Sequence, residues 1–398
     1  IAPDGTYTQQ STNYHRLMLQ AALWGYCLGK SQGRNFSLET NERLKAATMW
    51  LLSMVDSVNG QVPNLGPNDG AYIFPLSTCS FNDFRPTLQA ASSAFLLDRP
   101  FPTGAWDEMA NWFAIPDQPV STKEIERSKE QLAPKVIIRP VGSESWGYLR
   151  AANFTARPGH ADQLHLDLWW RGENITRDPG TYLYNAQPPW RNALAQSSVH
   201  NVITIDQQDQ MTSAGRFLWL DWAQAEIVEK IYGENGGLVE VTARHNGYRR
   251  LGIEHRRTVS AHLTGKWHVA DEILNINDHQ ARSDHPITHT VCLYWQLPDW
   301  EWLVENDTSE SCCLDFNSDS GEILMRVKLE LIEDRTSSLG NLMLVRAGKI
   351  VYGSGTLRPE AGWFSPTYTH KIPGLTLSYS TTSQLPLRIH SQFEFLEK

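Results

Sequence analysis

Two histidines and one aspartate in residues 157–204 have the side chains of a zinc site. His160 and His200 each precede a run of alternating or continuous apolar residues, and Asp178 lies between them in an Arg-Asp-Pro-Gly turn. Both runs predict β-strands, so an imidazole is expected at the start of each strand. Two histidines, one carboxylate and an open fourth position make a plausible zinc set. The spacing fits no short motif such as HExxH, so hydrogen-bonded structural histidines are the alternative.

The expected strand would place His160 on a face shared with apolar residues. On a strand that begins near His160, the even-numbered side chains share one face. His160 and Asp162 would then lie beside Leu164, Leu166 and Leu168. This arrangement predicts an imidazole at the rim of an apolar sheet face.

Length and charge limit the classes of protein to consider. The 398 residues suffice for about two domains. The formal net charge of -9 argues against a nucleic-acid partner, which needs a basic surface. No apolar run approaches the roughly 18 residues of a membrane helix, so no membrane span is expected. The 15 Trp and 13 Tyr favour sugar binding by stacking, although aromatic residues also fill cores.

Cysteines and the chain start say little about the compartment. The five cysteines form no CxxC pair and no disulfide framework. The sequence begins at Ile1, without an initiator Met or a signal peptide. We therefore expect a processed form or a piece of a longer protein.

Residues 1–116 have the periodicity of helices. The apolar spacing predicts helices near 11–29, 39–58, 83–97 and 106–113, joined by loops rich in Gly, Pro and Asn. Ser11 or Thr12 is the expected N-cap of the first helix, and Pro86 is tolerable in the first turn of the third. The pattern indicates stacked helical hairpins rather than a compact four-helix bundle.

Beyond a polar, charged segment at 117–135, which we interpret as a linker, the pattern changes to short strands. Residues 136–398 contain alternating runs such as 136–138, 146–149, 164–170, 225–228, 239–241 and 267–269. Many short strands with almost no helix signal predict a large antiparallel β-sandwich. The predicted fold class is α+β multidomain, with a helical portion followed by the sandwich.

With both halves considered, the sequence resembles the heparinase II/III-like polysaccharide lyases, which act on uronic acids of the alginate or heparin type. The segments that carry the resemblance follow the family's order: DGTYTQQSTNYHRLMLQ at 4–20, NDGAYIFPL at 68–76, DFRPTLQAA at 83–91, HAD, RDPGTY and SSVHNVITID within 160–206, HNGYRRL at 245–251, and GWFSPTY at 362–368. The resemblance implies that residues 1–116 are an incomplete (α/α)-toroid.

The resemblance also implies roles for individual residues. His160, Asp178 and His200 match the family's metal set, which implies one structural Zn²⁺ per chain. Tyr14 matches the catalytic tyrosine, with a packing role on an amphipathic helix as the alternative. Six residues are candidates for substrate binding: His15, Asn68, Asp69, Arg85, Arg191 and His245. For each of them a purely structural role is the alternative.

The sequence departs from the family in two places. In relatives an Asn-His pair that neutralises the substrate carboxylate lies upstream of the tyrosine segment, and here only thirteen residues precede Tyr14. Pro158 stands where the family has a histidine two positions before the first zinc ligand. The residues considered as substitutes are His15, Arg157, Arg191 and His245. We expect a segment preceding Ile1, or a second chain, to complete the helical ring and the site.

The sequence is compatible with three functions. The first is β-elimination on an acidic polysaccharide, in a periplasmic or secreted protein, with a cytoplasmic protein as the alternative. The second is glycoside hydrolysis on a helical scaffold by a carboxylate pair such as Asp69 and Asp83. The third is a non-catalytic glycan-binding relative.

Overall fold

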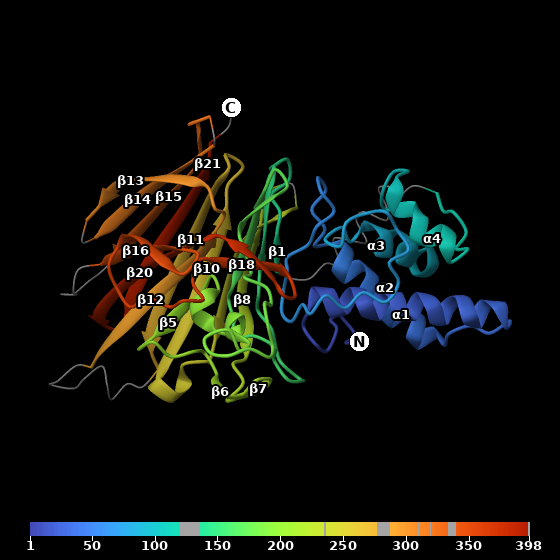
Figure 1. The fold of residues 1–398 in the computed structure, drawn as a ribbon, viewed down its shortest axis with the longest axis horizontal. Helices are drawn as coiled ribbons and strands as arrows, with labels where there is room; N and C mark the ends of the chain where they lie inside the picture. The colour runs from blue at the N-terminus through green and yellow to red at the C-terminus, as the bar shows by residue number, and fades with distance from the viewer. Residues whose placement is uncertain are drawn as a thin grey trace. The chain divides into compact units, whose positions relative to one another are not determined.

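The computed structural model describes residues 1–119, 136–234, 236–276, 287–308, 310–318, 320–332 and 340–396. The chain divides into two compact units (Figure 1). The helical unit comprises Ile1–Ile137 with Pro366–Tyr368, and the β unit comprises Ile138–Ser365 with Thr369–Lys398. Most of the predicted linker, residues 120–135, lies outside the described residues. In the ranges described, no helix is both long and apolar enough to cross a membrane.

The first helix of the helical unit begins where the sequence predicts. Ser11 is the N-cap, and its Oγ accepts the backbone N–H of Tyr14 at 3.1 Å. The apolar side chains of Leu19, Leu23 and Leu51 are fully buried, so the helices share one core. The described α-helices of this unit are α1 (Thr12–Ser31), α2 (Leu38–Leu52), α3 (Arg85–Ala91) and α4 (Glu108–Trp112).

The second helix is shorter than the apolar pattern predicts. It ends at Leu52 rather than near Val58. Asp56 turns the chain here, since its carboxylate accepts the N–H groups of Val58 at 2.9 Å and Asn59 at 3.3 Å. Such local side-chain hydrogen bonds compete with helix continuation.

The third predicted helix is divided. Its α-helical part is α3, and a π-helical turn, Ser92–Leu96, follows directly. Leu97 then takes the left-handed conformation, with φ of 55°, which ends the helix. The fourth predicted helix consists of a 3₁₀ turn, Ala105–Asp107, and α4.

The β unit is built from antiparallel sheets and hairpins (Figure 1). The eight-stranded sheet has the order β13 (Glu301–Asp307), β14 (Ser311–Asn317), β15 (Ile323–Ile332), β21 (Leu387–Phe395), β11 (Lys266–Asn275), β10 (Ile253–Ala261), β9 (Leu238–His245) and β8 (Ala225–Tyr232). The five-stranded sheet has the order β17 (Lys349–Gly353), β16 (Asn341–Arg346), β20 (Leu375–Gln384), β12 (Thr288–Leu297) and β5 (Ile203–Ile205). The four-stranded sheet has the order β1 (Ile137–Ile138), β2 (Ser145–Leu149), β3 (Leu166–Trp170) and β4 (Glu173–Thr176). The two hairpins are β6 (Thr212–Gly215) with β7 (Leu218–Leu220), and β18 (Trp363–Thr367) with β19 (His370–Pro373).

Aromatic residues join the smaller sheets to one face of the eight-stranded sheet. Trp267 of β11 lies opposite Phe393 of β21, so the two side chains share a face. Phe393 contacts Trp295 of β12, with ring centroids 4.9 Å apart. Trp267 donates a hydrogen bond to Ser145 of β2 at 2.9 Å. The four- and five-stranded sheets therefore pack on the same face, which confirms the predicted antiparallel β-sandwich.

The prediction that a strand begins near His160 is wrong. The β3 strand begins at Leu166, and the residues before it form an irregular segment. Leu164 has a φ of +62°, which no strand residue adopts. The N–H of His165 donates to the carbonyl of Asp162 at 3.1 Å, closing a turn. Alternation of faces therefore does not apply between His160 and Leu164.

Candidate metal centre and candidate active-site residues

The three predicted metal ligands lie together in the β unit. His160 is in the segment before β3, Asp178 follows β4, and His200 follows a 3₁₀ turn, Ser197–Val199, that leads to β5. His160 Nδ1 is 3.2 Å from His200 Nε2. Asp178 Oδ2 is 4.0 Å from His160 Nδ1 and 3.6 Å from His200 Nε2. All three side chains are buried, so one ion could contact three ligand atoms shielded from water.

Neighbouring hydrogen bonds leave these ligand atoms available. His200 Nδ1 lies 2.7 Å from the carbonyl of Gln196, which makes Nδ1 the donor and leaves the lone pair on Nε2. Asp178 Oδ1 accepts the N–H of Gly180 at 2.8 Å. Asp178 Oδ2 is buried and accepts no hydrogen bond from the described residues. A buried carboxylate oxygen without a donor, facing two imidazole nitrogens, fits a bound cation.

Burial and the mutual charges of Asp178, His160 and His200 shift the pKa values of all three side chains. Burial opposes the charged form of Asp178, yet the histidines, His200 foremost, hold its pKa well below the usual range. Burial lowers the pKa of His160 to about 4. Burial also acts to lower the pKa of His200, but Asp178 outweighs it and the pKa is raised. A cation bound here would compete with protonation of His200 for the position beside Asp178.

Asp162 belongs to the same group of potential ligands, a role that the sequence pattern did not assign to it. The ligand atoms of His160, Asp162, Asp178 and His200 all lie within 4.8 Å of one another. Asp162 Oδ1 is also 2.8 Å from Arg150 Nε, and both side chains are buried. Arg150 therefore balances the Asp162 charge, so the cluster contains a second carboxylate that already has a cationic partner.

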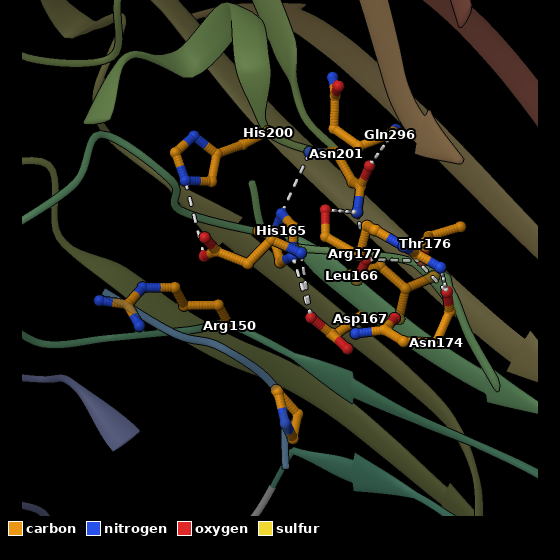
Figure 2. A network of polar contacts seen from close by, with 12 residues as sticks. Arg150, His165, Leu166, Asp167, Asn174, Thr176, Arg177, His200, Asn201 and Gln296 are labelled. Carbon is orange, nitrogen blue, oxygen red and sulfur yellow. Dashed lines mark hydrogen bonds and ion pairs between the residues drawn. The ribbon is translucent and has the colours of Figure 1, made fainter. Parts of the chain in front are cut away.

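Asn201 fixes the chain directly after His200. Figure 2 shows its side chain between Leu166 and Gln296. Asn201 Nδ2 donates to the Leu166 carbonyl at 2.9 Å, and Oδ1 accepts the N–H of Gln296 at 2.6 Å. Thr176 Oγ1 donates to the same Leu166 carbonyl at 2.8 Å. The segments that carry His200 and Asp178 are therefore tied to β3 and β12, which orients the ligands.

Arg257 of β10 supports the centre from the eight-stranded sheet. Its Nη1 donates to the carbonyls of Leu164 at 2.7 Å and Asn201 at 2.5 Å. Those carbonyls belong to the two segments that carry His160 and His200. The sequence contained a signal for this residue, because alternation in β10 places Arg257 on the same inward face as Ile253 and Val259.

In the helical unit, Tyr14 and Asp69 are brought together. The Tyr14 hydroxyl donates to Asp69 Oδ2 at 2.5 Å, a short hydrogen bond. Asp69 Oδ1 accepts the N–H of Ala71 at 3.2 Å. Asn68 is adjacent, and its side chain accepts from Gly70 N–H and donates to Asn64 Oδ1 at 2.7 Å. Asp69 thus orients the phenol, while Asn68 braces the loop.

Arg85 and His15 make contacts within the protein that the sequence did not predict. Arg85 Nη2 contacts Asp83 Oδ2 at 2.7 Å, and its guanidinium lies over the Trp106 ring at 3.9 Å. The His15 side chain is fully buried, stacks on Trp50 at 4.8 Å and contacts the Ala47 carbonyl at 2.8 Å. Direct substrate contact by His15 would need an exposed edge, which this side chain lacks.

His245 and Arg191, both in the β unit, occupy opposite environments. His245 is buried, with Nε2 3.0 Å from Nδ1 of His255, whose Nε2 is 2.7 Å from Asp271 Oδ1. This chain of hydrogen bonds belongs to the sheet interior, so His245 does not present its ring to a ligand. Arg191 is exposed and lines a cavity of about 230 Å³.

Known proteins share this architecture. Similar solved structures include the heparan sulfate lyase HepC from Pedobacter heparinus, with 14% identity and a TM-score of 0.62, covering 100% of this chain and 54% of that chain. A heparinase III structure has 12% identity and a TM-score of 0.63, covering 100% of this chain and 55% of that one. At these identities the likeness shows the fold alone. The chain spans about half the length of these solved structures, and a comparison with curated proteins found no match.

The sequence of the β unit gives the family. The description "Heparinase II/III-like, C-terminal" matches residues 148–391, which is more than half of the 398 residues. This stretch contains the buried cluster of two histidines and two aspartates and most of the sandwich. The chain therefore belongs to the heparinase II/III-like family.

Proposed function

We propose that this protein is a polysaccharide lyase that cleaves a uronic-acid-containing polysaccharide by β-elimination. The family match supports the reaction class. The observation that carries the residue-level proposal is the short hydrogen bond between the Tyr14 hydroxyl and Asp69. A phenol that donates a hydrogen bond to a carboxylate can pass its proton to that carboxylate while its oxygen takes up another proton.

The proposed reaction breaks the C5–H bond and the C4–O4 bond of a uronic acid and forms a C4–C5 double bond. Tyr14 takes the C5 proton, and Asp69, which accepts the Tyr14 hydrogen bond, is placed to receive the phenolic proton. The proton then returns through Tyr14 to the leaving O4 oxygen. The electron pair of the C5–H bond becomes the double bond, and the C4–O4 pair leaves with oxygen. Each proton transfer contributes on the order of 10²–10⁴ in rate.

We also propose one structural Zn²⁺ held by His160, Asp178 and His200. The buried Asp178 Oδ2 without a hydrogen-bond donor supports this assignment. When bound, the ion would fix three separate segments of the β unit to one point. These residues position the surrounding loops, while proton transfer belongs to Tyr14. An acidic extracellular polymer as substrate favours a periplasmic or secreted protein.

A digestion assay tests the reaction class. Elimination produces a conjugated, unsaturated uronate that absorbs in the ultraviolet, whereas hydrolysis produces none. Incubation with heparan sulfate and with alginate should raise the ultraviolet absorbance in proportion to new chain ends. New reducing ends without absorbance would instead indicate a hydrolase, and binding without new chain ends would indicate a glycan-binding protein.

One observation weighs against the hydrolase with Asp69 and Asp83. Asp83 forms a two-point ion pair with Arg85, with Nε to Oδ1 at 3.0 Å and Nη2 to Oδ2 at 2.7 Å. Both carboxylate oxygens of Asp83 are therefore engaged by one guanidinium rather than turned toward a substrate. Asp83 is therefore poorly suited to act as the acid of a hydrolytic pair.

A further inference from the structure

A cavity of about 230 Å³ in the β unit is lined by two arginines. It lies between the β6–β7 hairpin and the segment that begins at Arg191. Its described lining contains no carboxylate; the residues are Arg191, Asn192, Gln196, Ser213, Gly215, Arg216 and Trp219. Two guanidinium groups, amide and hydroxyl groups and one indole form a cationic pocket with an aromatic wall.

Arg216, which lines the pocket, has one donor without an acceptor in the described part of the chain. Its Nε is buried and has no hydrogen-bond partner among the described residues. A third arginine, Arg157, lies close by without lining the cavity: its guanidinium and that of Arg216 are 5.4 Å and 5.7 Å from the centroid of the Phe217 ring. A buried N–H without an acceptor is costly, so the described residues do not fill the hydrogen-bonding capacity of the Arg216 guanidinium.

Hydrogen bonds hold the wall of the pocket in place. Asn192 has a left-handed conformation, with φ of 50°, and its side chain donates to the Arg216 carbonyl at 2.7 Å. Trp219 is nearly buried and donates from Nε1 to the Gly159 carbonyl at 3.1 Å. Both contacts join the hairpin to other segments, so Arg216 is held in a defined place.

We propose that this cavity binds the anionic group, carboxylate or sulfate, of an acidic sugar unit. The planar fork of arginine pairs with the oxygens of either group, and such charge-assisted bonds are stronger than neutral ones. The proposal rests on the proposed function, since an acidic polysaccharide is the ligand that would carry these groups. It assigns Arg216, together with Arg191, to recognition of the substrate's charge.

The cavity is connected to the metal centre at two points. The Gln196 carbonyl, from a residue that lines the cavity, contacts His200 Nδ1 at 2.7 Å. Trp219, also in the lining, bonds to Gly159, which precedes His160. Each wall is therefore attached to a segment that carries a ligand. Loss of the metal should loosen both walls and weaken anion binding.

Calorimetric titration of the full chain tests the proposal. The probes are an unsulfated glucuronate-containing disaccharide, its sulfated counterpart and a neutral disaccharide. Wild type should bind one or both acidic probes and not the neutral one, and the comparison of the two acidic probes identifies carboxylate or sulfate as the recognised group. Arg216→Gln and Arg191→Gln should each weaken binding roughly 10-fold or more, the loss of a charge-assisted bond.

Controls separate this result from other causes. Arg249→Gln removes an exposed arginine that does not line the cavity and should bind as wild type. Arg191 is exposed, so Arg191→Gln keeps the test valid if Arg216→Gln fails to fold. Chelation of the metal should weaken acidic-probe binding in wild type, with metal content measured in parallel.

The outcomes also separate the cavity from the catalytic proposal. Unchanged affinity in both arginine variants, or equal binding of the neutral disaccharide, would overturn the anion site even if polysaccharide cleavage is observed. Arginine-dependent binding without formation of the unsaturated product would instead retain the anion site and reject the lyase.

Discussion

Arg257 and Asp271 lie directly opposite each other on β10 and β11 and form a fully buried ion pair with two contacts. Arg257 Nε is 2.7 Å from Asp271 Oδ1, and Nη2 is 2.9 Å from Oδ2. The remaining nitrogen, Nη1, reaches the carbonyls of Leu164 and Asn201. One guanidinium thus connects a sheet to two of the three segments of the candidate metal centre.

Removing Asp271 should destabilise the protein strongly. Asp271→Ala leaves the Arg257 charge buried without its partner, and such a loss costs about 3–5 kcal/mol. Urea unfolding of metal-loaded protein should show a lower midpoint. Glu42→Ala, which removes an exposed partner of Lys45, is the control and should cost under about 1 kcal/mol. Equal midpoints for the two variants would show that the buried pair contributes little.

Metal removal should lower the melting temperature. Binding of structural zinc can contribute on the order of 10 kcal/mol, so apo protein should melt earlier. Metal analysis should give one zinc per chain, and His200→Ala should lose both the zinc and the effect of a chelator. His370→Ala, at an exposed histidine, is the matched control and should keep both. A chelator effect that survives in His200→Ala would refute this ligand assignment.

Tyr14 should be needed for turnover and not for stability. Tyr14→Phe keeps the ring but removes the transferable proton, so turnover should fall on the order of 10²-fold or more. Asp69→Asn should also reduce turnover, because the amide cannot receive the phenolic proton as a carboxylate can. Tyr26→Phe, on the same helix, is the control for loss of a hydroxyl. Near-normal turnover in a folded Tyr14→Phe protein would rule out the proposed role.

Burial of His15 should make the helical unit sensitive to acid. Burial lowers the pKa of His15 from 6.5 to about 4, against the opposing effect of the Ala47 carbonyl. Between these values the unfolded chain binds a proton that the folded chain does not, so stability falls as pH falls through this range. Above the unfolded pKa both states are neutral and the penalty is absent. The loss should amount to a few kcal/mol at the lower end.

The experiment compares wild type with His15→Gln, which can still donate to the Ala47 carbonyl. The free energy of unfolding is measured by urea titration from neutral to acidic pH. The difference between the two proteins should change with pH in the range stated above and should be constant at neutral pH. A difference that does not vary with pH would exclude His15 as the source of the acid sensitivity.

The sequence predicted the components of the metal cluster better than their local structure. Residue type identified His160, Asp178 and His200, and the structure brings their ligand atoms together. The strand predicted for His160 was wrong, because the left-handed Leu164 and the Asp162 turn replace it. Periodicity describes faces only where the backbone is regular, and ligand segments depart from regularity.

The remaining residues of the site depend on distant contacts. Asn201 is positioned by bonds to Leu166 and Gln296, and no local pattern indicates these partners. The Tyr14–Asp69 bond joins a helix to a loop 55 residues further along the chain. His15 and His245 were considered as ligand-facing imidazoles, and the structure buries both. Side-chain type does not distinguish an imidazole that faces a ligand from one that completes an interior hydrogen-bond network.

The position of Arg257 in the chain has a consequence for protein synthesis. Its hydrogen bonds reach back 93 residues to Leu164 and 56 residues to Asn201. On the ribosome, His160, Asp178 and His200 are therefore made before the strands that hold their loops. Until β10 emerges, the Leu164 and Asn201 carbonyls lack this donor, and we expect the ligand segments to be prone to non-native contacts in that interval. The rate at which β10 and β11 are translated and docked should therefore set how much newly made chain reaches the native arrangement of this cluster.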